Sequence, residues 1–407
     1  MRSEIELEKA QEQGGISLSK YWRFLVIIQL IVVLIVGLAG SPLAEGTALK
    51  IESLSSILLE PESGEVLFQN NADLKLPPAS VTKLMVMLLV LEAVDKGQIK
   101  LTDTVTASPE ACKMGGSQIW LEPGEQMTVT ELLKAVCIVS ANDASYALGE
   151  HLAGSEENFI ALMNKRAAEL GLKDTHYVNT TGLEPSLGET GNITSARDMA
   201  CLAREVINHP TVFRWSGIWI DSLRGGKSFL RNTNNLVRFY QGCDGLKTGF
   251  TNQAGFCLVA TAKRQGVRLV AVVMKAPNTQ TRSRDVSKLF NYGFAQYKAY
   301  PIYRGGENLG KVTVFRGRQN YVQAIVPQEL TAVLKRDFKG EIVRSVKLSP
   351  LVKAPVLKGA KIGEVLLSAG GKACGRVDLI ADCTVPKASF FELCSQIFHH
   401  IIKVGVY

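Results

Sequence analysis

The sequence predicts an α+β fold, in which helices surround an antiparallel sheet, together with a second, small all-β domain. Helix and strand patterns alternate between residues 45 and about 295, and after Tyr300 the pattern changes to short strand-like runs. The length of 407 residues favours two domains over one. A composition of 46% apolar and 21% charged residues is typical of a globular protein with a sizeable core.

Residues 1–44 have the anatomy of an export signal. Lys20 and Arg23 precede the apolar run at 24–40, and small residues follow it. This run is shorter than the roughly 20 residues of a membrane span, so a cleaved signal peptide and an uncleaved signal anchor both remain open. In either case we expect the basic flank to stay in the cytoplasm, and the rest of the chain to be exported to the outer face of the cell membrane.

Residues 45–297 are predicted to form the first domain. Two apolar runs around a Pro/Gly turn predict a hairpin, Thr128 and Glu131 have the spacing of a capping box, and a run that is apolar on nearly all sides predicts a buried central helix. In chain order we expect a hairpin at 55–69, helices at 80–94, 128–139, 155–171 and 194–207, an edge strand at 244–251, two strands at 255–276 and a helix at about 278–295.

Residues 298–384 are predicted to form the small β-rich domain, because short strand-like runs recur there between turn residues. Residues 385–407 are predicted to form an amphipathic C-terminal helix, which can lie in a membrane interface or dock on its own domain. Its apolar face would hold Phe390, Phe391, Cys394, Ile397, Phe398, Ile401 and Ile402.

The formal net charge of +8 belongs to the chain after residue 44, because the first 44 residues carry four basic and four acidic side chains. A basic protein suits work beside an anionic polymer or a membrane, although the charge also fits plain solubility. The eight cysteines show no CxxC pair and no His partners at metal-ligand spacing, so we expect no zinc and interpret most of them as small buried hydrophobes.

A serine and a lysine three residues apart, Ser80 and Lys83 in PPASVTKLM, are the candidate chemical groups. Residues three apart in a helix share a face, so the Lys83 amine can reach the Ser80 hydroxyl. The amine can take the proton of that hydroxyl only if its pKa is lowered, which the apolar run after Lys83 would favour. Alone the pattern is weak, because Ser17 and Lys20 repeat it inside the export signal and because a serine here also fits a helix cap.

Two further segments strengthen the interpretation. VSANDA places Ser140 and Asn142 at the end of a predicted helix, and DGLKTGFT places Lys247, Thr248 and Gly249 in the predicted edge strand. Ser-x-x-Lys, Ser-x-Asn and Lys-Thr-Gly, in this order, form the set used by penicillin-recognising serine acyltransferases. All three together are far less probable by chance than any one of them.

From about residue 50 to 300 the sequence resembles the low-molecular-mass penicillin-binding proteins, the serine-type D-alanyl-D-alanine carboxypeptidases. The resemblance implies a fold of the transpeptidase and β-lactamase type. It also implies removal of the terminal D-Ala of peptidoglycan stem peptides through an acyl-enzyme on Ser80, and acylation of the same serine by β-lactam antibiotics. No cofactor, metal or nucleic-acid partner is expected. The segments that carry the resemblance are PPASVTKLM, GGSQIWLEPGEQMTV, SANDAS, NTNNL and GCDGLKTGFTNQAGFCLVATA.

The resemblance assigns three catalytic roles. Ser80 would attack the carbonyl of the penultimate D-Ala, Lys83 would act as its base, and Ser140 would relay the proton to the leaving amine. The backbone N–H groups of Ser80 and Phe250 would form the oxyanion hole, in which one donor is worth about 3 to 4 kcal/mol.

The resemblance also assigns the substrate contacts. Asn142 would hold the peptide, and Lys247 would lend positive potential and orient Ser140. Thr248 and Arg282 would bind the terminal carboxylate, for which a bidentate guanidinium is well suited. Gly249 would let the substrate backbone pair alongside the strand. Where members of this family often carry His, this chain has Asn192, a difference that bears on loop-dependent specificity.

Three other functions compete with the carboxypeptidase. A DD-endopeptidase differs only on the amine side of the site, so sequence separates it poorly. A penicillin-binding sensor would be acylated without turning over, and the intact Lys83 and Ser140 argue against it. A class A β-lactamase would need a Glu-x-x-x-Asn segment between Ser140 and Lys247, which the sequence lacks.

Overall fold

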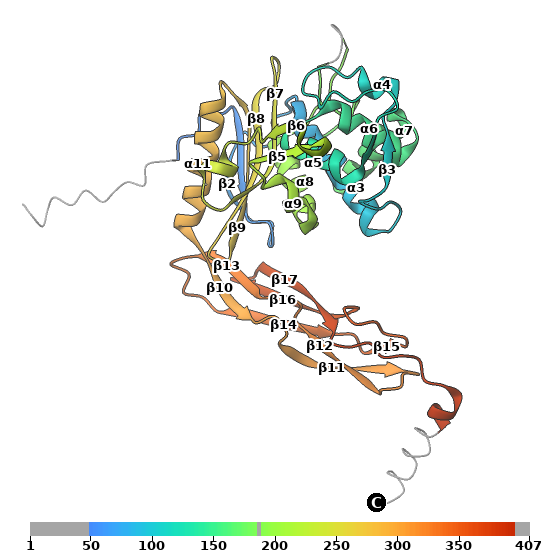
Figure 1. Cartoon of the computed structure of the whole chain (residues 1–407). Coiled ribbons are helices and arrows are strands. Elements are labelled where there is room, and N and C mark those ends of the chain that lie inside the picture. The colour runs from blue at the N-terminus through green and yellow to red at the C-terminus, as the bar shows by residue number, and fades with distance from the viewer. Residues whose placement is uncertain (1–48, 185–188, 395–407) are drawn as a thin grey trace, which may run out of the picture. The chain divides into compact units, whose positions relative to one another are not determined.

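The computed structural model describes residues 49–184 and 189–394, and it confirms the predicted α+β class (Figure 1). The first region contains a five-stranded antiparallel sheet in which β7 is an edge strand, as expected. In spatial order its strands are β2 (Val66–Asn70), β1 (Ser55–Leu59), β9 (Val267–Ala276), β8 (Gly255–Arg264) and β7 (Cys243–Thr251).

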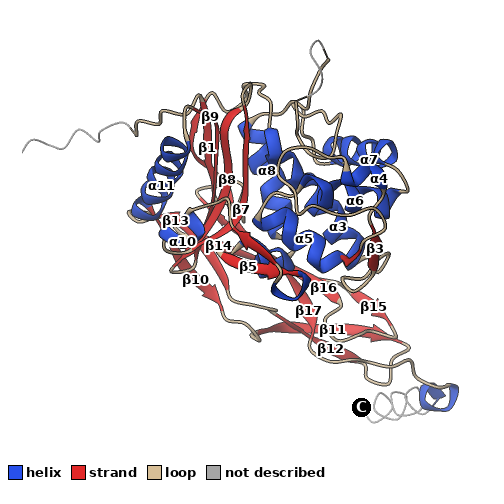
Figure 2. Cartoon of the chain, turned by 45° about the horizontal axis from the view of Figure 1, so that its top comes forward, coloured by secondary structure: helices blue, strands red, loops and turns tan. Residues whose placement is uncertain are grey.

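Helices cover both faces of this sheet (Figure 2). On one face lies α11 (Thr279–Gln296), which packs on β8 and β9. The other face carries α3 (Lys83–Asp95), α5 (Val129–Ile138), α6 (Asn142–Ala153), α7 (Glu156–Glu169) and α8 (Ala196–Ile207). Three short helices complete the region, α4 (Pro109–Cys112), α9 (Phe213–Ser216) and α10 (Leu236–Phe239), with the 3₁₀ turns η1 (Ala79–Thr82), η2 (Pro210–Val212) and η3 (Arg224–Gly226). It also has two two-stranded sheets, formed by β3 (Thr104–Thr106) with β4 (Gln126–Thr128) and by β5 (Ile220–Leu223) with β6 (Ser228–Arg231).

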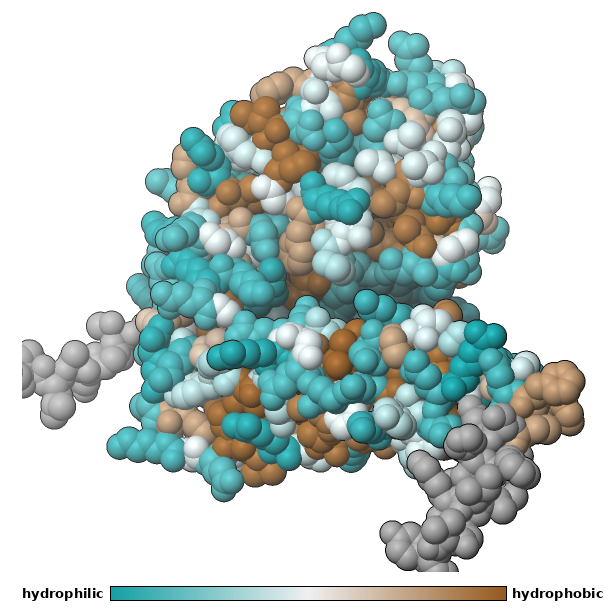
Figure 3. Space-filling model, turned by 60° about the horizontal axis from the view of Figure 1, so that its bottom comes forward, coloured by the Kyte–Doolittle hydropathy of each residue, from teal (hydrophilic) through white to brown (hydrophobic). Residues whose placement is uncertain are grey.

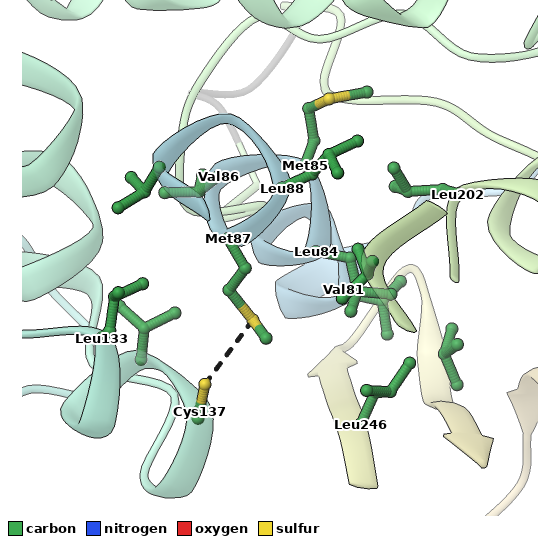
Figure 4. Close-up of a cluster of buried hydrophobic side chains, with 14 of the residues drawn as sticks. Val81, Leu84, Met85, Val86, Met87, Leu88, Leu133, Cys137, Leu202 and Leu246 are labelled. Carbon is green, nitrogen blue, oxygen red and sulfur yellow. Dashed lines mark hydrogen bonds between the residues drawn. The ribbon is translucent and has the colours of Figure 1, made fainter. Parts of the chain in front are cut away.

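The predicted central helix is η1 followed directly by α3, and nine residues of α3 are buried. Its apolar side chains meet three neighbouring elements, with Leu133 and Cys137 on α5, Leu202 on α8 and Leu246 on β7 (Figure 4). A helix that is apolar all round is stable only inside a core. This packing therefore fixes the first turn of α3, where Lys83 begins the helix.

Local sequence signals account for most of the other boundaries. The Thr128 hydroxyl accepts the Glu131 N–H at 3.2 Å and the Glu131 carboxylate accepts the Thr128 N–H at 2.9 Å, so the predicted capping box starts α5. The predicted hairpins are β1 with β2 and β8 with β9. One placement was wrong, because α5 ends at Ile138 and Asn142 is already the first residue of α6.

The second region is all-β, as expected, and has its own apolar core. Its six-stranded sheet runs in the order β14 (Ile342–Leu348), β16 (Lys361–Ala369), β17 (Lys372–Ala381), β12 (Tyr321–Ile325), β11 (Asn308–Phe315) and β15 (Leu351–Lys353). A two-stranded sheet of β10 (Tyr297–Tyr303) and β13 (Leu330–Lys335) contributes to the same core. Alternate residues of β12 and β16 are buried, which is the period of a strand with one face on a core.

The predicted export signal at 1–44 lies outside the described residues. In the part of the chain that is described, every helix is too short or too polar to cross a bilayer. The predicted C-terminal helix begins at Phe390 and is described to residue 394, and Ser389 and Glu392 form reciprocal hydrogen bonds at its start. Phe390 and Phe391 are 74% and 83% exposed. On the face of the molecule shown in Figure 3, most of the surface is hydrophilic, with smaller hydrophobic patches.

All eight cysteines lie among the described residues and are free thiols. The prediction of buried hydrophobes holds for half of them, namely Cys137, Cys243, Cys257 and Cys374. Cys201 and Cys394 are exposed.

Candidate active site

Ser80 and Lys83 lie one 3₁₀ turn apart, where η1 runs into α3. The Lys83 amine is 3.0 Å from the Ser80 hydroxyl oxygen and donates a hydrogen bond of 2.8 Å to the Thr181 carbonyl. Ala79, just before the serine, has a φ of +49°, a left-handed backbone that costs energy for a non-glycine residue. Ser80 is half-buried and Lys83 is fully buried, so a hydroxyl at the surface faces an amine in the core.

Burial lowers the pKa of the Lys83 amine well below its ordinary value, and the positive charge of Lys247 lowers it further. Asp143 opposes this effect on the Lys83 pKa, but it is the smallest of the three influences. The lowered pKa favours the un-ionised form of the amine, which can accept a proton. This is the condition under which a lysine activates a serine.

Ser140 lies in the link between α5 and α6, and Asn142 is the first residue of α6. Ser140 has a φ of +65° and is buried. The Asn142 side chain donates to the Gly115 carbonyl at 2.6 Å, while its backbone N–H donates to the Ser117 carbonyl at 2.7 Å. Within the described residues, the Ser140 hydroxyl and the Asn142 amide oxygen have no hydrogen-bond partner, which leaves both free to contact a substrate.

Lys247 and Thr248 lie on β7, the edge strand. The Lys247 side chain is buried and donates to the Thr248 carbonyl at 3.1 Å, while the Ser140 hydroxyl has no partner among the described residues. Burial, with help from the charge of Arg282, lowers the pKa of Lys247 to about 7. Its positive charge is thus held in a weakly solvated place, where it acts strongly on anything bound nearby.

Arg282, in the first turn of α11, is brought to β7 by a residue that the sequence analysis did not single out. The Thr233 hydroxyl accepts a hydrogen bond of 2.6 Å from the Thr248 hydroxyl, and the Thr233 carbonyl accepts one of 3.4 Å from the Arg282 guanidinium. Arg282 is only 5% exposed, and burial lowers its pKa to about 10. Its Nε has no hydrogen-bond partner among the described residues, so this N–H donor of the guanidinium is available to an anion.

Gly249 has a different neighbour from the one expected. A Cβ at this position would lie 2.8 Å from the Pro78 carbonyl and 3.1 Å from the Ser80 nitrogen, so the missing side chain lets β7 pack against η1. This close approach accounts for the glycine without a substrate. It also sets the Ser80 N–H beside the strand whose next residue is Phe250, which is half-exposed and packs on Phe256 with ring centroids 4.2 Å apart.

Asp143 is a second residue that the sequence analysis did not interpret. It is fully buried, and its carboxylate accepts the N–H groups of Ile119 and Leu121 at 3.1 to 3.2 Å. It follows Asn142 directly, so it holds the 115–121 loop against the residue that contacts Gly115 and Ser117. Its position in SANDAS is the one signal that could have indicated it.

The structure thus brings the three short segments to one place, with a hydroxyl beside an amine of lowered pKa and two further buried basic side chains nearby. This fold and site define a serine acyl-enzyme peptidase of the penicillin-recognising class. The chain belongs to the D-alanyl-D-alanine carboxypeptidase family, whose sequence profile matches residues 43–278. Residues 297–387 match the profile of the C-terminal domain of penicillin-binding protein 5.

Individual relatives agree with the family. The chain is 40% identical over 349 residues to the D-alanyl-D-alanine carboxypeptidase DacF of Bacillus subtilis, covering 85% of this chain and 89% of the relative. Among solved structures, penicillin-binding protein 5 of Haemophilus influenzae is similar with a TM-score of 0.63 and 30% identity, over 83% of this chain and 98% of that one. Penicillin-binding protein D2 of Listeria monocytogenes, solved with ampicillin bound, is similar with a TM-score of 0.55 and 32% identity, over 60% and 98%.

Proposed function

We propose that this chain removes the terminal D-Ala from peptidoglycan stem peptides through an acyl-enzyme on Ser80. The observation that carries the proposal is the Ser80 hydroxyl lying 3.0 Å from a fully buried Lys83 amine, whose pKa is lowered by burial. A lowered pKa makes the lone pair of the amine more available than that of an exposed lysine.

In acylation, the Ser80 oxygen attacks the carbonyl carbon of the penultimate D-Ala while its proton passes to the Lys83 nitrogen. The negative charge that develops on the carbonyl oxygen is stabilised by the N–H groups of Ser80 and Phe250. The peptide C–N bond then breaks, and the amine of the terminal D-Ala takes a proton through Ser140 as it leaves. A water molecule, activated by Lys83, hydrolyses the ester and restores the Ser80 hydroxyl.

The terminal carboxylate would be bound by Arg282, Thr248 and the positive potential of Lys247. Arg282 and Thr248 share Thr233 as a hydrogen-bond partner, which supports their acting on one group. The Asn142 amide would hold the peptide backbone. β-Lactams would acylate the same serine, because they present a strained amide carbonyl together with a carboxylate.

Ser80→Ala tests the proposal. The variant should lose fluorescent-penicillin labelling and D-alanine release from a diacetyl-Lys-D-Ala-D-Ala peptide, by about four orders of magnitude or more. Ser287→Ala is the matched control, since the Ser287 hydroxyl bonds within α11 to the Ser283 carbonyl and should leave both activities unchanged. Labelling that persists in Ser80→Ala would place the nucleophile elsewhere.

The same assay separates the alternatives. Penicillin labelling without D-alanine release would indicate a sensor that is acylated but does not turn over. Cleavage of cross-linked dimeric muropeptides at a higher kcat/KM than the free peptide would indicate a DD-endopeptidase.

We also propose that the protein works at the outer face of the cell membrane, held there by an N-terminal anchor or by the C-terminal helix. The exposed Phe390 and Phe391 support the second anchor. Truncation before Ser389 should release the protein from membranes if mass spectrometry finds the N-terminal signal cleaved. If the truncated protein stays bound, the anchor is N-terminal.

A further inference from the structure

The Asn192 side chain has an unusual set of contacts for a residue outside the catalytic set. It is only 4% exposed. Its amide oxygen accepts the N–H groups of Val178 and Asn179 at 2.7 and 3.1 Å, and its amide nitrogen donates to the Thr82 hydroxyl and the Asn179 carbonyl at 3.0 Å each. One side chain therefore joins η1, between the nucleophile and its base, to the chain at 178–179.

The segment 178–183, which we call the base-facing turn, is held in a single conformation. The Asn179 carboxamide oxygen accepts the N–H groups of Thr181 and Gly182 at 3.2 and 2.7 Å. Gly182 has a φ of +78°, and a Cβ there would lie 1.9 Å from the Ala79 carbonyl oxygen. The turn is thus pressed against η1, and no larger residue fits at Gly182.

The base-facing turn provides a hydrogen-bond acceptor for the Lys83 amine. The Thr181 carbonyl accepts a hydrogen bond from the Lys83 amine at 2.8 Å. A neutral amine has two N–H groups and one lone pair. With one N–H directed at a fixed carbonyl and the Ser80 oxygen 3.0 Å away, the amine can turn its lone pair toward the serine proton.

We propose that Asn192 is a positioning residue for acylation, which acts through Asn179 and the Thr181 carbonyl to orient the Lys83 amine and keep water from it. Asn192 does not bond to any residue assigned to the substrate. The proposal rests on the proposed function, because it concerns the base of that reaction. The other charged groups that act on Lys83 are Lys247 on β7 and Asp143 on α6, and both stay in place in the test below.

Asn192→Ala tests the proposal in the full-length protein. The rate constant for acylation by a fluorescent penicillin, per active site titrated, is measured from pH 5 to 9, together with kcat and KM for the diacetyl peptide. We expect acylation at pH 7 to fall about 10- to 100-fold, kcat to fall with it, and KM to change little. Because water would reach the amine, its pKa should rise, so the acid limb of the acylation profile should move to higher pH.

Asn164→Ala is the matched control. Asn164, on α7, bonds through both ends of its amide to Tyr177, the residue just before the base-facing turn, donating to its carbonyl at 2.7 Å and accepting its N–H at 2.8 Å. It does not bond to Thr82 or Asn179, so its loss should lower stability without moving the acid limb. Asn179→Ala, at a less buried position, should reproduce the shift even if Asn192→Ala folds poorly.

Three outcomes would overturn the proposal: an acid limb that stays fixed in Asn192→Ala while only the amount of acylable protein falls, an equal shift in Asn164→Ala, or an unshifted limb in Asn179→Ala. Failure of the proposed function would look different, since the unmodified protein would then either not be acylated or not release D-alanine from the diacetyl peptide.

Discussion

The two regions of the molecule differ in whether they bury charged side chains. The first region, residues 51–296, buries acidic and basic side chains, whereas in the described part of the second region, residues 297–394, every Asp, Glu, Lys and Arg is at least partly exposed. Burying a charge costs several kcal/mol unless it is neutralised or paired. The buried set in the first region is Glu60, Lys83, Asp143, Asp198, Lys247, Arg282 and Asp285. Three of these seven belong to the proposed site, which indicates that their burial serves chemistry rather than stability.

Backbone conformation makes the same distinction. Among the described non-glycine residues, seven positive φ angles fall in the first region and one, at Arg316, in the second. Two of the seven are Ala79 and Ser140, which adjoin or form the proposed catalytic residues. Strain of this kind persists only where the surrounding structure imposes it, and it gathers at functional sites. The β-rich region, by contrast, is built from regular strands whose alternation follows the sequence.

The largest expected effect separates chemistry from stability. Lys83→Met keeps the length and burial of the side chain but removes the base. We expect acylation by penicillin to fall about 10³-fold or more, without a fall in unfolding temperature, because burial disfavours the charged amine in the native protein and methionine removes that cost. Acylation is measured by stopped-flow fluorescence and stability by calorimetry.

Leu367→Ala gives the opposite result in the second region. Leu367, on β16, is fully buried, so its truncation should cost about 2 to 5 kcal/mol in the free energy of unfolding. Acylation should be unchanged. If Lys83→Met were instead strongly destabilising and still acylated, the distinction between the regions would fail.

A smaller effect is expected from a matched pair of glycines. A Cβ at Gly249 would lie 2.8 Å from the Pro78 carbonyl, and one at Gly363 would lie 2.7 Å from the Lys347 carbonyl. Both alanine variants should lose about 1 to 3 kcal/mol through overpacking. Only Gly249→Ala should also slow acylation, by about tenfold or more, since the backbone that must move includes Ser80.

Urea unfolding and penicillin labelling measure the two effects. Equal acylation in the two glycine variants would mean that β7 can move away from η1 without disturbing the nucleophile. The proposed oxyanion hole of Ser80 and Phe250 would then lose its support.

Much of this organisation could be predicted from local sequence. Hairpins, the capping box at Thr128 and the apolar helix after Lys83 are all determined by residues close together in the chain. Helix α6 was missed because its buried face includes Asp143 and Ser145, whose burial depends on bonds to Leu121 and Thr180. Apolar periodicity cannot reveal such a helix.

The site was predicted to the extent that it is made of side chains in short motifs. What the sequence could not provide are groups that act through the backbone or across long separations. Every residue has a backbone carbonyl, so the amino-acid sequence cannot show that the carbonyl of Thr181 has a special role. Thr233 bonds Thr248, 15 residues away, and Arg282, 49 residues away, and only the fold creates these contacts. The hydrogen bond from Lys247 to the Thr248 carbonyl, on its own strand, is likewise a backbone contact that no motif specifies.

The last expected effect builds up gradually with pH, and it concerns Lys247 and the stability of the native protein. Its pKa is about 7 in the native protein and about 10.4 in an unfolded chain. Between these values the unfolded chain holds a proton that the native protein has lost, so stability rises with pH through this window, by at most roughly 1.4 kcal/mol per pH unit, and is level below pH 7.

Lys247→Met should remove this rise, and the difference between the two proteins, measured by urea unfolding from pH 6 to 9.5, isolates it. The β-rich region should show no such dependence, since all its described lysines are at least partly exposed. A difference that stays level across this range would mean that Lys247 remains charged in the native protein. Its repulsion would then add to burial in lowering the pKa of Lys83 throughout the working range of pH.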